Sequence, residues 1–264
     1  MSKSALCIGI NDYPGTESDL AGCVNDANDW SSLLGQRGYL VRQMLDGEAT
    51  KAAMVQAIGD LIGAARNGDS VVITYSGHGT WVPDTSGDES DGRDEGLCPH
   101  DISDGNVLLD DELTEIFRLR EAGVRVLLIA DSCHSGSVTR GNDADLDPGM
   151  PRARFLPPSV WADDTQLAPA ALSRSGGFGS FSRLGGDLLM AGCRDAEFSW
   201  DTRFGGRPNG AFTYYALKTL QQLGPDASYQ DWFRAIGNHL PTTRLPQTPQ
   251  ILGSRSARHF PIFE

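Results

Sequence analysis

Runs of apolar and β-branched residues alternate with amphipathic segments along the first half of the chain. The runs predict strands at 5–10, 39–45, 71–75 and 124–130. The segments between them carry apolar residues at helical spacing and predict helices over 20–34, over 50–65 after a Thr50 cap, and from a cap at Asp110 or Asp111. Buried strands separated by helices are typical of a parallel sheet with helices on both faces.

The pattern changes after residue 136. Residues 137–186 contain several prolines, glycines and serines and show no sustained periodicity. A stretch of about 50 residues without regular structure is rare inside a compact domain and usually marks a functional or disordered segment. Beyond it, the pattern predicts a strand at 188–191, helices at 211–223 and 228–240, and a short apolar segment at 250–252.

Two polar, glycine-rich sequences directly follow predicted strands. Ser76-Gly77-His78-Gly79 comes after the strand at 71–75, and Asp131-Ser132-Cys133-His134 comes after the strand at 124–130. Ligands of parallel sheets bind beyond the carboxyl ends of the strands, so an imidazole and a thiol are expected at one edge of the sheet. Adjacent residues of a strand point apart, which favours His78 over His134 as the partner of Cys133.

A thiol and an imidazole at one edge indicate nucleophilic catalysis. The imidazole can take the proton of the thiol, whose ordinary pKa is about 8.5, and later protonate a leaving amine. The alternative, a cysteine that is simply buried, is the interpretation we give to Cys7 and Cys193. His100, His239 and His259 lack such surroundings and are expected to be surface or core residues.

Composition and charge narrow the classes of partner. The 264 residues carry a formal net charge of −13, which argues against nucleic acid or an anionic membrane and favours basic peptides or cations. No apolar run approaches the roughly 18 residues of a membrane span, and no signal peptide is recognisable. Five cysteines without metal-type spacing predict free thiols and a cytoplasmic location.

The same two motifs carry a resemblance to a family. Tyr75-Ser76-Gly77-His78-Gly79 and Asp131-Ser132-Cys133-His134-Ser135-Gly136 resemble the catalytic motifs of the metacaspases, which are caspase-like cysteine peptidases. Further segments resemble the family in the same order, at 22–27, 87–95, 110–113, 191–195 and 210–213. The compact chain is similar to the bacterial type that is sometimes called an orthocaspase.

The resemblance implies an α/β, caspase-like fold whose six-stranded, mostly parallel sheet is flanked by helices. It divides one structural domain into a large-subunit-like part at 1–136, a flexible processing linker at 137–186 and a small-subunit-like part at 187–264. It also implies that Cys133 is the nucleophile and that His78 is the general base and then the acid. The N–H groups of Gly79 and Cys133 would bind the oxyanion.

A carboxylate beside the nucleophile bears on specificity. Asp131 and Cys133 are two residues apart, so their side chains emerge on the same side of an extended strand, where a carboxylate favours a basic substrate residue. The resemblance implies that Asp131 and Asp26 form a pocket for arginine or lysine. The alternatives are a structural hydrogen-bonding role for Asp131 and a solvated helix carboxylate for Asp26. Other positions that resemble pocket residues of metacaspases or paracaspases are Cys23, Ser76 and Glu197.

The loop from Asp84 to Glu95 is rich in carboxylates. Its sixth position is Glu89, where an EF-hand loop requires glycine, so the loop is not an EF-hand. A solvated acidic loop that leads to a helix N-terminus would account for the same residues. The residues alone therefore leave both a cation site and a solvated acidic loop open.

The metacaspase resemblance nevertheless implies a calcium-binding site. Three positions match the activating calcium site by spacing, namely Asp94, Asp110 and Asp111. A fourth matching position holds Arg140, and Asp143 or Asp145 would have to replace it. We therefore expect no required cofactor and treat calcium at these aspartates as a hypothesis.

The linker contains basic residues that an arginine-specific enzyme could cut. The candidate processing sites are Arg140, Arg152, Arg154, Arg174 and Arg183. Cleavage by the protein itself and cleavage by an upstream activating protease both fit this composition. Either would convert a zymogen into its active form.

The sequence thus predicts a cysteine endopeptidase that cuts after Arg, and less well after Lys, through a Cys133–His78 dyad. Its partners would be proteins or peptides with exposed Arg or Lys, with no nucleic acid and no membrane, and we expect a monomer. Two other functions stay open: a catalytically silent caspase-like scaffold or regulator, and a Cys–His hydrolase of small molecules. Caspase-type aspartate preference is disfavoured because no arginine matches the pocket positions.

Overall fold

A computed structural model describes residues 1–83, 93–133, 150–162 and 187–264. Its centre is a six-stranded sheet in the order β12-β9-β7-β3-β1-β2. The strands are β1 (Lys3–Gly9), β2 (Leu40–Leu45), β3 (Ser70–Ser76), β7 (Arg125–Asp131), β9 (Asp187–Ala191) and β12 (Gln250–Gly253). All neighbours pair in parallel except β12, which is antiparallel to β9. The predicted mostly parallel sheet is confirmed.

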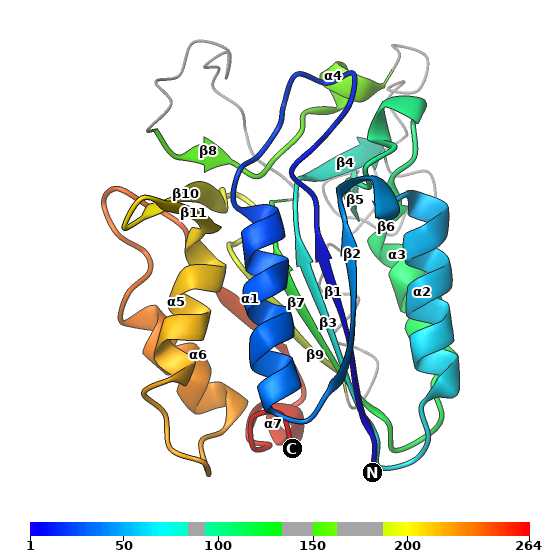
Figure 1. Ribbon diagram of the computed structural model, residues 1–264, viewed down its shortest axis with the longest axis vertical. Helices are drawn as coiled ribbons and strands as arrows, with labels where there is room; N and C mark the ends of the chain where they lie inside the picture. The colour runs from blue at the N-terminus through cyan, green and yellow to red at the C-terminus, as the bar shows by residue number, and fades with distance from the viewer. Residues whose placement is uncertain (84–92, 134–149, 163–186) are drawn as a thin grey trace.

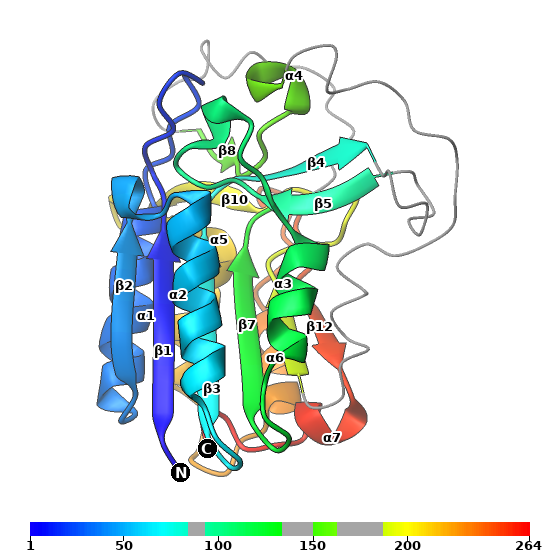
Figure 2. The ribbon, with the colours of Figure 1, turned by 90° about the vertical axis from the view of Figure 1, so that its right-hand side faces the viewer.

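Helices cover both faces of this sheet (Figures 1 and 2). One face packs against α1 (Cys23–Gln36), α5 (Ala211–Leu220) and α6 (Tyr229–Gly237), and the other against α2 (Lys51–Ala64) and α3 (Asp110–Arg118). Successive residues of β1 alternate between the two cores: Leu6 and Ile8 face α2, whereas Ala5 and Cys7 face α1. Burial on both faces explains why these strands are apolar along their length.

Smaller elements lie beyond the carboxyl ends of the parallel strands (Figure 2). One antiparallel sheet contains β4 (Gly79–Pro83), β5 (Arg93–Leu97) and β6 (Leu108–Leu109), and another contains β8 (Arg152–Ala153), β10 (Trp200–Phe204) and β11 (Arg207–Gly210). The short helices η1 (Asp46–Glu48), η2 (Ile102–Asp104) and α4 (Pro158–Trp161) lie at this end too, whereas the short helix α7 (Arg255–Arg258) lies at the opposite end of the sheet. The hydrophobic pattern predicts neither small sheet, because these strands are short and only partly apolar.

Local signals set most helix boundaries. The Thr50 hydroxyl accepts the N–H of Ala53 at 3.4 Å, so the predicted cap of α2 is confirmed. The predicted Asp110 or Asp111 cap is wrong: Leu109 precedes α3 and both aspartates lie in its first turn. The Glu112 carboxylate instead accepts the Leu109 N–H at 3.0 Å, and carboxylates in a first helical turn are favoured by the helix dipole.

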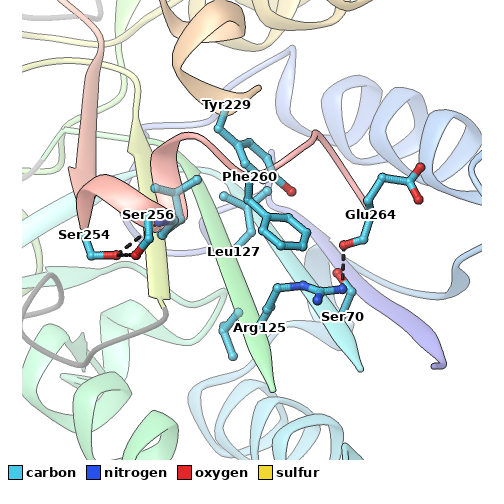
Figure 3. Close-up of a pocket in the computed structure, with 11 residues that line it drawn as sticks. Ser70, Arg125, Leu127, Tyr229, Ser254, Ser256, Phe260 and Glu264 are labelled. Atoms are coloured by element: carbon cyan, nitrogen blue, oxygen red, sulfur yellow. Dashed lines mark hydrogen bonds between the residues drawn. The ribbon is translucent and has the colours of Figure 1, made fainter. Parts of the chain in front are cut away.

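A cavity of about 200 Å³ lies at the amino ends of β3 and β7, the opposite edge from His78 and Cys133 (Figure 3). The Arg125 guanidinium stacks 4.4 Å from the centre of the Phe260 ring and donates to the Glu264 carbonyl at 2.6 Å. These contacts fix the C-terminal residues against the sheet. Among the described residues, none of the helices combines the length and apolarity that a bilayer crossing requires.

Candidate active site

The two polar motifs converge on a single peptide carbonyl. Ser76 and Asp131, the last residues of the neighbouring strands β3 and β7, are paired in register, so the turns that follow lie together. The N–H groups of Gly79 and Cys133 both donate to the carbonyl oxygen of Arg154, at 3.0 and 3.1 Å. The structure therefore brings the histidine and cysteine motifs to one point, and a residue of the predicted linker lies there.

Residues 152–156, which we call the bound segment, run as an extended chain between β10 and β4. Residues 152 and 153 form β8, which pairs antiparallel with β10. The Arg154 N–H donates to the Ser199 carbonyl at 2.9 Å, and the Leu156 N–H donates to the Gly79 carbonyl at 2.9 Å. Extended peptides bind to sheet edges through this type of backbone pairing.

The Arg154 side chain is fully buried among three carboxylates. Its Nη2 lies 2.7 Å from Asp26 Oδ2 and 3.3 Å from Asp201 Oδ2, and its Nη1 lies 3.2 Å from Asp131 Oδ2. We call these three aspartates the acidic pocket. The planar guanidinium presents two nitrogens in a fixed fork, which lets it bind carboxylates on both sides at once.

Asp131 is held in place by donors from Ser199 and Thr213, which follow it in the sequence by more than 65 residues. One carboxylate oxygen accepts the backbone N–H of Thr213 at 2.9 Å and its hydroxyl at 2.8 Å, and the other accepts the Ser199 hydroxyl. Gly210 leaves room for the ion pair, since a Cβ there would collide with the Asp131 carboxylate and the Arg154 guanidinium. Asp131 thus has a structural role in addition to its place in the pocket.

The other two carboxylates also accept protein hydrogen bonds. Asp26 accepts the Asn209 side-chain amide at 2.9 Å and the Gly210 N–H at 3.1 Å. Asp201 accepts the Gly22 N–H at 2.8 Å. These donors fix the orientation of the carboxylates, so the geometry of the pocket is set by surrounding backbone and side chains.

The pocket is electrostatically matched to a cation. Burial raises the pKa of Asp26 to about 7, against the opposing influence of the Arg154 charge and the Asn209 hydrogen bond. Burial also acts to lower the pKa of Arg154, but the charges of Asp131 and Asp26 outweigh it and hold that pKa well above its ordinary value. A charged guanidinium therefore occupies this pocket, and its removal would favour protonation of Asp26.

His78 is buried as a neutral imidazole with one free lone pair. Its Nε2 lies 2.6 Å from the Ser18 carbonyl, which can only accept, so Nε2 carries the hydrogen. Its Nδ1 is buried and has no hydrogen-bond partner among the described residues. The Tyr13 ring packs 4.7 Å from the imidazole, and burial lowers the pKa of His78 to about 4. The ring is thus neutral at neutral pH, with its proton on Nε2 and the lone pair of Nδ1 free.

The Cys133 thiol is buried beside a second cysteine. Its Sγ accepts the Ser199 N–H at 2.6 Å and lies 3.4 Å from the Ser199 carbonyl. Cys193 belongs to the same small apolar cluster, and the hydrogen bond with Cys133, together with burial, raises the pKa of Cys193 well above its ordinary value. Cys193 is buried, as expected, but it also contacts the proposed nucleophile.

The remaining predicted pocket residues occupy different places. Cys23 Sγ lies 3.9 Å from Asp201 Oδ2, at the pocket, and Ser76 is buried on β3 beside Asp131. Glu197 points elsewhere, because its carboxylate accepts the backbone N–H and hydroxyl of Thr248 at 2.5 and 2.9 Å. The structure supplies Asp201 as the third carboxylate instead.

The arginines of the predicted linker also occupy different places. Arg152 donates to the Asp19 carbonyl at 2.9 Å and stays outside the acidic pocket. Of the two candidate processing residues that the structure describes, only Arg154 enters that pocket. The others, Arg140, Arg174 and Arg183, lie outside the described residues.

The candidate calcium residues lie around the β4-β5-β6 sheet. Asp94 is in β5, which pairs with β6, and β6 leads directly to Asp110 and Asp111 in α3. In the described ranges, no group of three or more His, Cys, Asp or Glu residues is arranged to hold a metal. Asp143, Asp145 and the acidic residues of 84–92 lie outside those ranges, so the calcium hypothesis stays a prediction.

Comparisons with known proteins show the family to which the sequence is similar. The family model "Metacaspase, peptidase C14 domain" matches residues 3–141. Metacaspase-1 of Cryptococcus neoformans is 31% identical over 96% of this chain, which spans 62% of the length of that relative. Metacaspase-1A of Aspergillus fumigatus is 30% identical over 94% of this chain and is covered over 68% of its own length.

Solved structures show what this fold is similar to. The crystal structure of protein GSU0716 from Geobacter sulfurreducens matches with a TM-score of 0.73 at 31% identity, covering 100% of this chain and 98% of that one. Caspase-1 from Spodoptera frugiperda matches with a TM-score of 0.59 at 12% identity, covering 96% of this chain and 87% of that one, which shows a caspase-like fold. Because the family model and the curated relatives agree, the chain belongs to the metacaspase family.

Proposed function

We propose that this protein is a cysteine endopeptidase that cleaves after arginine through Cys133 and His78. The observation that carries the proposal is the position of Arg154. Its guanidinium lies among the three carboxylates of the acidic pocket while its carbonyl accepts the N–H groups of Gly79 and Cys133. Side chain and scissile carbonyl are thus held together, as a substrate for cleavage after arginine requires.

The proposed chemistry combines Cys133, whose N–H binds that carbonyl, with His78, whose buried Nδ1 has no partner among the described residues. In this proposal the Cys133 thiol turns from the Ser199 carbonyl, 3.4 Å away, and gives its proton to His78 Nδ1, and the thiolate sulfur attacks the carbonyl carbon of the arginine. The carbon–nitrogen bond then breaks, and the imidazolium gives its proton to the leaving amine. The product is a thioester between Cys133 and the arginine, which water hydrolyses to a carboxylate and the free thiol.

The N–H groups of Gly79 and Cys133 would stabilise the oxyanion. They already lie 3.0 and 3.1 Å from the Arg154 carbonyl oxygen, and both are backbone groups that need no reorientation. Donors that are fixed before negative charge develops are among the largest contributions to catalysis. The Ser18 carbonyl would assist indirectly, because it keeps the hydrogen of His78 on Nε2 and leaves Nδ1 as the base.

The pocket favours arginine over lysine and rejects acidic residues. One guanidinium nitrogen binds Asp26 and Asp201 while the other binds Asp131. A lysine has a single ammonium group and cannot reproduce this two-sided contact, so it should be cleaved less well. A substrate carboxylate would add a fourth negative charge. The substrates we propose are proteins or peptides with exposed Arg, and less readily Lys.

We also propose that the protein cuts its own Arg154–Phe155 bond, and that this cleavage in the linker activates it. While the bond is intact, the bound segment occupies the groove that another substrate would need. Cleavage by an upstream protease is the alternative route.

The five free, buried cysteines support a reducing location such as the cytoplasm.

Self-cleavage can be followed by intact mass spectrometry. The wild-type chain should yield fragments 1–154 and 155–264 and should then hydrolyse an arginine reporter peptide, but not an aspartate one. Cys133→Ala and Arg154→Gln should remain uncut at this bond, whereas Arg152→Gln, its matched control, should be cut normally. Equal fragmentation of Cys133→Ala would assign the cut to another protease. If wild type cleaves neither itself nor the reporter, the chain is a silent scaffold.

The acidic pocket should control the rate of this cut. Asp26→Asn removes one charge from a fully buried ion pair, a class of change that costs about 3–5 kcal/mol, so self-cleavage should slow by about tenfold or more. Arg154→Lys should also be cut more slowly than wild type. The control is Glu115→Gln, which removes the exposed ion pair with Arg118 on α3, away from the pocket. Equal slowing in both variants, measured by fragment time courses, would contradict the pocket assignment.

Burial of neutral His78 should make stability depend on pH. The folded-state pKa of about 4 lies below the unfolded value of about 6.5, so this stabilisation is present above pH 6.5 and is lost as the pH falls towards 4. Between pH 7.5 and 4.5, uncut Cys133→Ala should lose about 2–3 kcal/mol more free energy of unfolding than Cys133→Ala/His78→Gln. Urea unfolding at the two pH values measures this, and an equal loss in both proteins would contradict a buried neutral base.

A further inference from the structure

We infer that the protein has an aromatic site for the residue that follows the cleaved bond, and that it selects substrates with a large apolar side chain there. The inference rests on the proposed function, since it takes Arg154–Phe155 as the bond to be cut. It adds a second determinant of specificity on the other side of that bond. The substrate class becomes arginine followed by phenylalanine or a residue of similar size and apolarity.

The Phe155 side chain is buried in a small apolar cluster at the site. It is 5% exposed and packs with the buried Cys133 and Cys193 and with the partly buried Trp81 and Phe198. The centres of the Phe155 and Phe198 rings are 6.1 Å apart with an interplanar angle of 53°. This is within the range of distances and tilted orientations that aromatic pairs prefer.

Backbone contacts fix where this side chain must lie. Gly79 donates its N–H to the Arg154 carbonyl, and its own carbonyl accepts the Leu156 N–H, so a single glycine holds the residues on both sides of Phe155. Phe155 and Gly79 also form a parallel bridge. Any substrate that places its arginine carbonyl at the same N–H groups would direct its next side chain into the same cluster.

The walls of the cluster come from the two chain segments that hold the substrate backbone. Trp81 lies in β4, two residues after Gly79, and the Arg93 guanidinium stacks 4.2 Å from the centre of its ring. Phe198 directly precedes Ser199, whose carbonyl accepts the Arg154 N–H. Its ring packs edge-on against Trp200, with 5.9 Å between the centres. The aromatic walls are therefore positioned together with the groups that bind the scissile peptide.

The chemistry of the cluster distinguishes among substrates. A substrate ring at this position contacts another ring and has its surface removed from water. We expect these contacts to raise kcat/KM about tenfold or more over a substrate with alanine. A carboxylate or ammonium group in the same place would be buried without a partner and should be rejected. Leucine and methionine would keep the apolar burial without the ring contact and should fall close to phenylalanine.

Four internally quenched peptides test the preference. Each contains a single arginine, directly before the bond, and the four carry Phe, Leu, Ala or Asp directly after it. The enzyme is the Phe155→Ala chain after self-cleavage, so that its own ring does not compete, with the self-cleaved wild type beside it. We expect kcat/KM for the Phe peptide to exceed that for the Ala peptide about tenfold, with Asp lowest.

Phe198→Ala then tests the wall itself. It should lower kcat/KM for the Phe peptide about tenfold and leave the Ala peptide within about twofold, and Phe198→Leu should recover part of the loss. An equal fall for all four peptides would show a merely structural role and overturn the assignment. If Phe198→Ala fails to fold, the four peptides still test the inference on the enzymes that keep Phe198. Similar rates for all four peptides on those enzymes would overturn it. Cleavage of none of them would instead contradict the proposed function.

Discussion

The structure at the sheet edge depends on the charge balance between one guanidinium and three buried carboxylates. Asp26 comes from α1, Asp131 from the end of β7 and Asp201 from β10, so the acidic pocket joins the part of the chain before residue 137 and the part after residue 186. Three carboxylates placed this close together in a buried site are unfavourable without a cation. Arg154 supplies that cation from the segment between the two parts, and a substrate arginine would supply the same charge.

The parallel sheet explains why the remaining chemical groups meet at the same place. β3 and β7 are neighbours in register, and each ends in a turn that presents one backbone N–H towards the Arg154 carbonyl. His78 is oriented from a third segment, through the Ser18 carbonyl. Groups from distant parts of the sequence thus depend on strand pairing for their positions, and the apolar sequences of the strands stabilise that pairing.

The hydrophobic pattern predicts the large sheet and its helices because burial on one or both faces leaves a periodic signal. The placement of His78 and Cys133 after adjacent strands follows from the same pattern. Asp201 leaves no such signal: it lies in a short antiparallel strand, and its role depends on contacts with Gly22 and Arg154, which are distant in the sequence. The selection of Arg154 over Arg152 likewise depends on how β8 pairs with β10, which composition does not specify.

If the Arg154–Phe155 bond is cut as proposed, the attachments of the bound segment affect the order of the events that follow. On one side, Arg154 remains in the acidic pocket and β8 remains paired with β10. On the other side, Leu156 is fully buried in the main core and the Trp161 indole donates to the Thr80 hydroxyl at 3.1 Å. Both new chain ends would therefore be retained by non-covalent contacts, and the groove would open only when they dissociate. Product dissociation, and not scission alone, would then set the delay before the enzyme acts on other proteins.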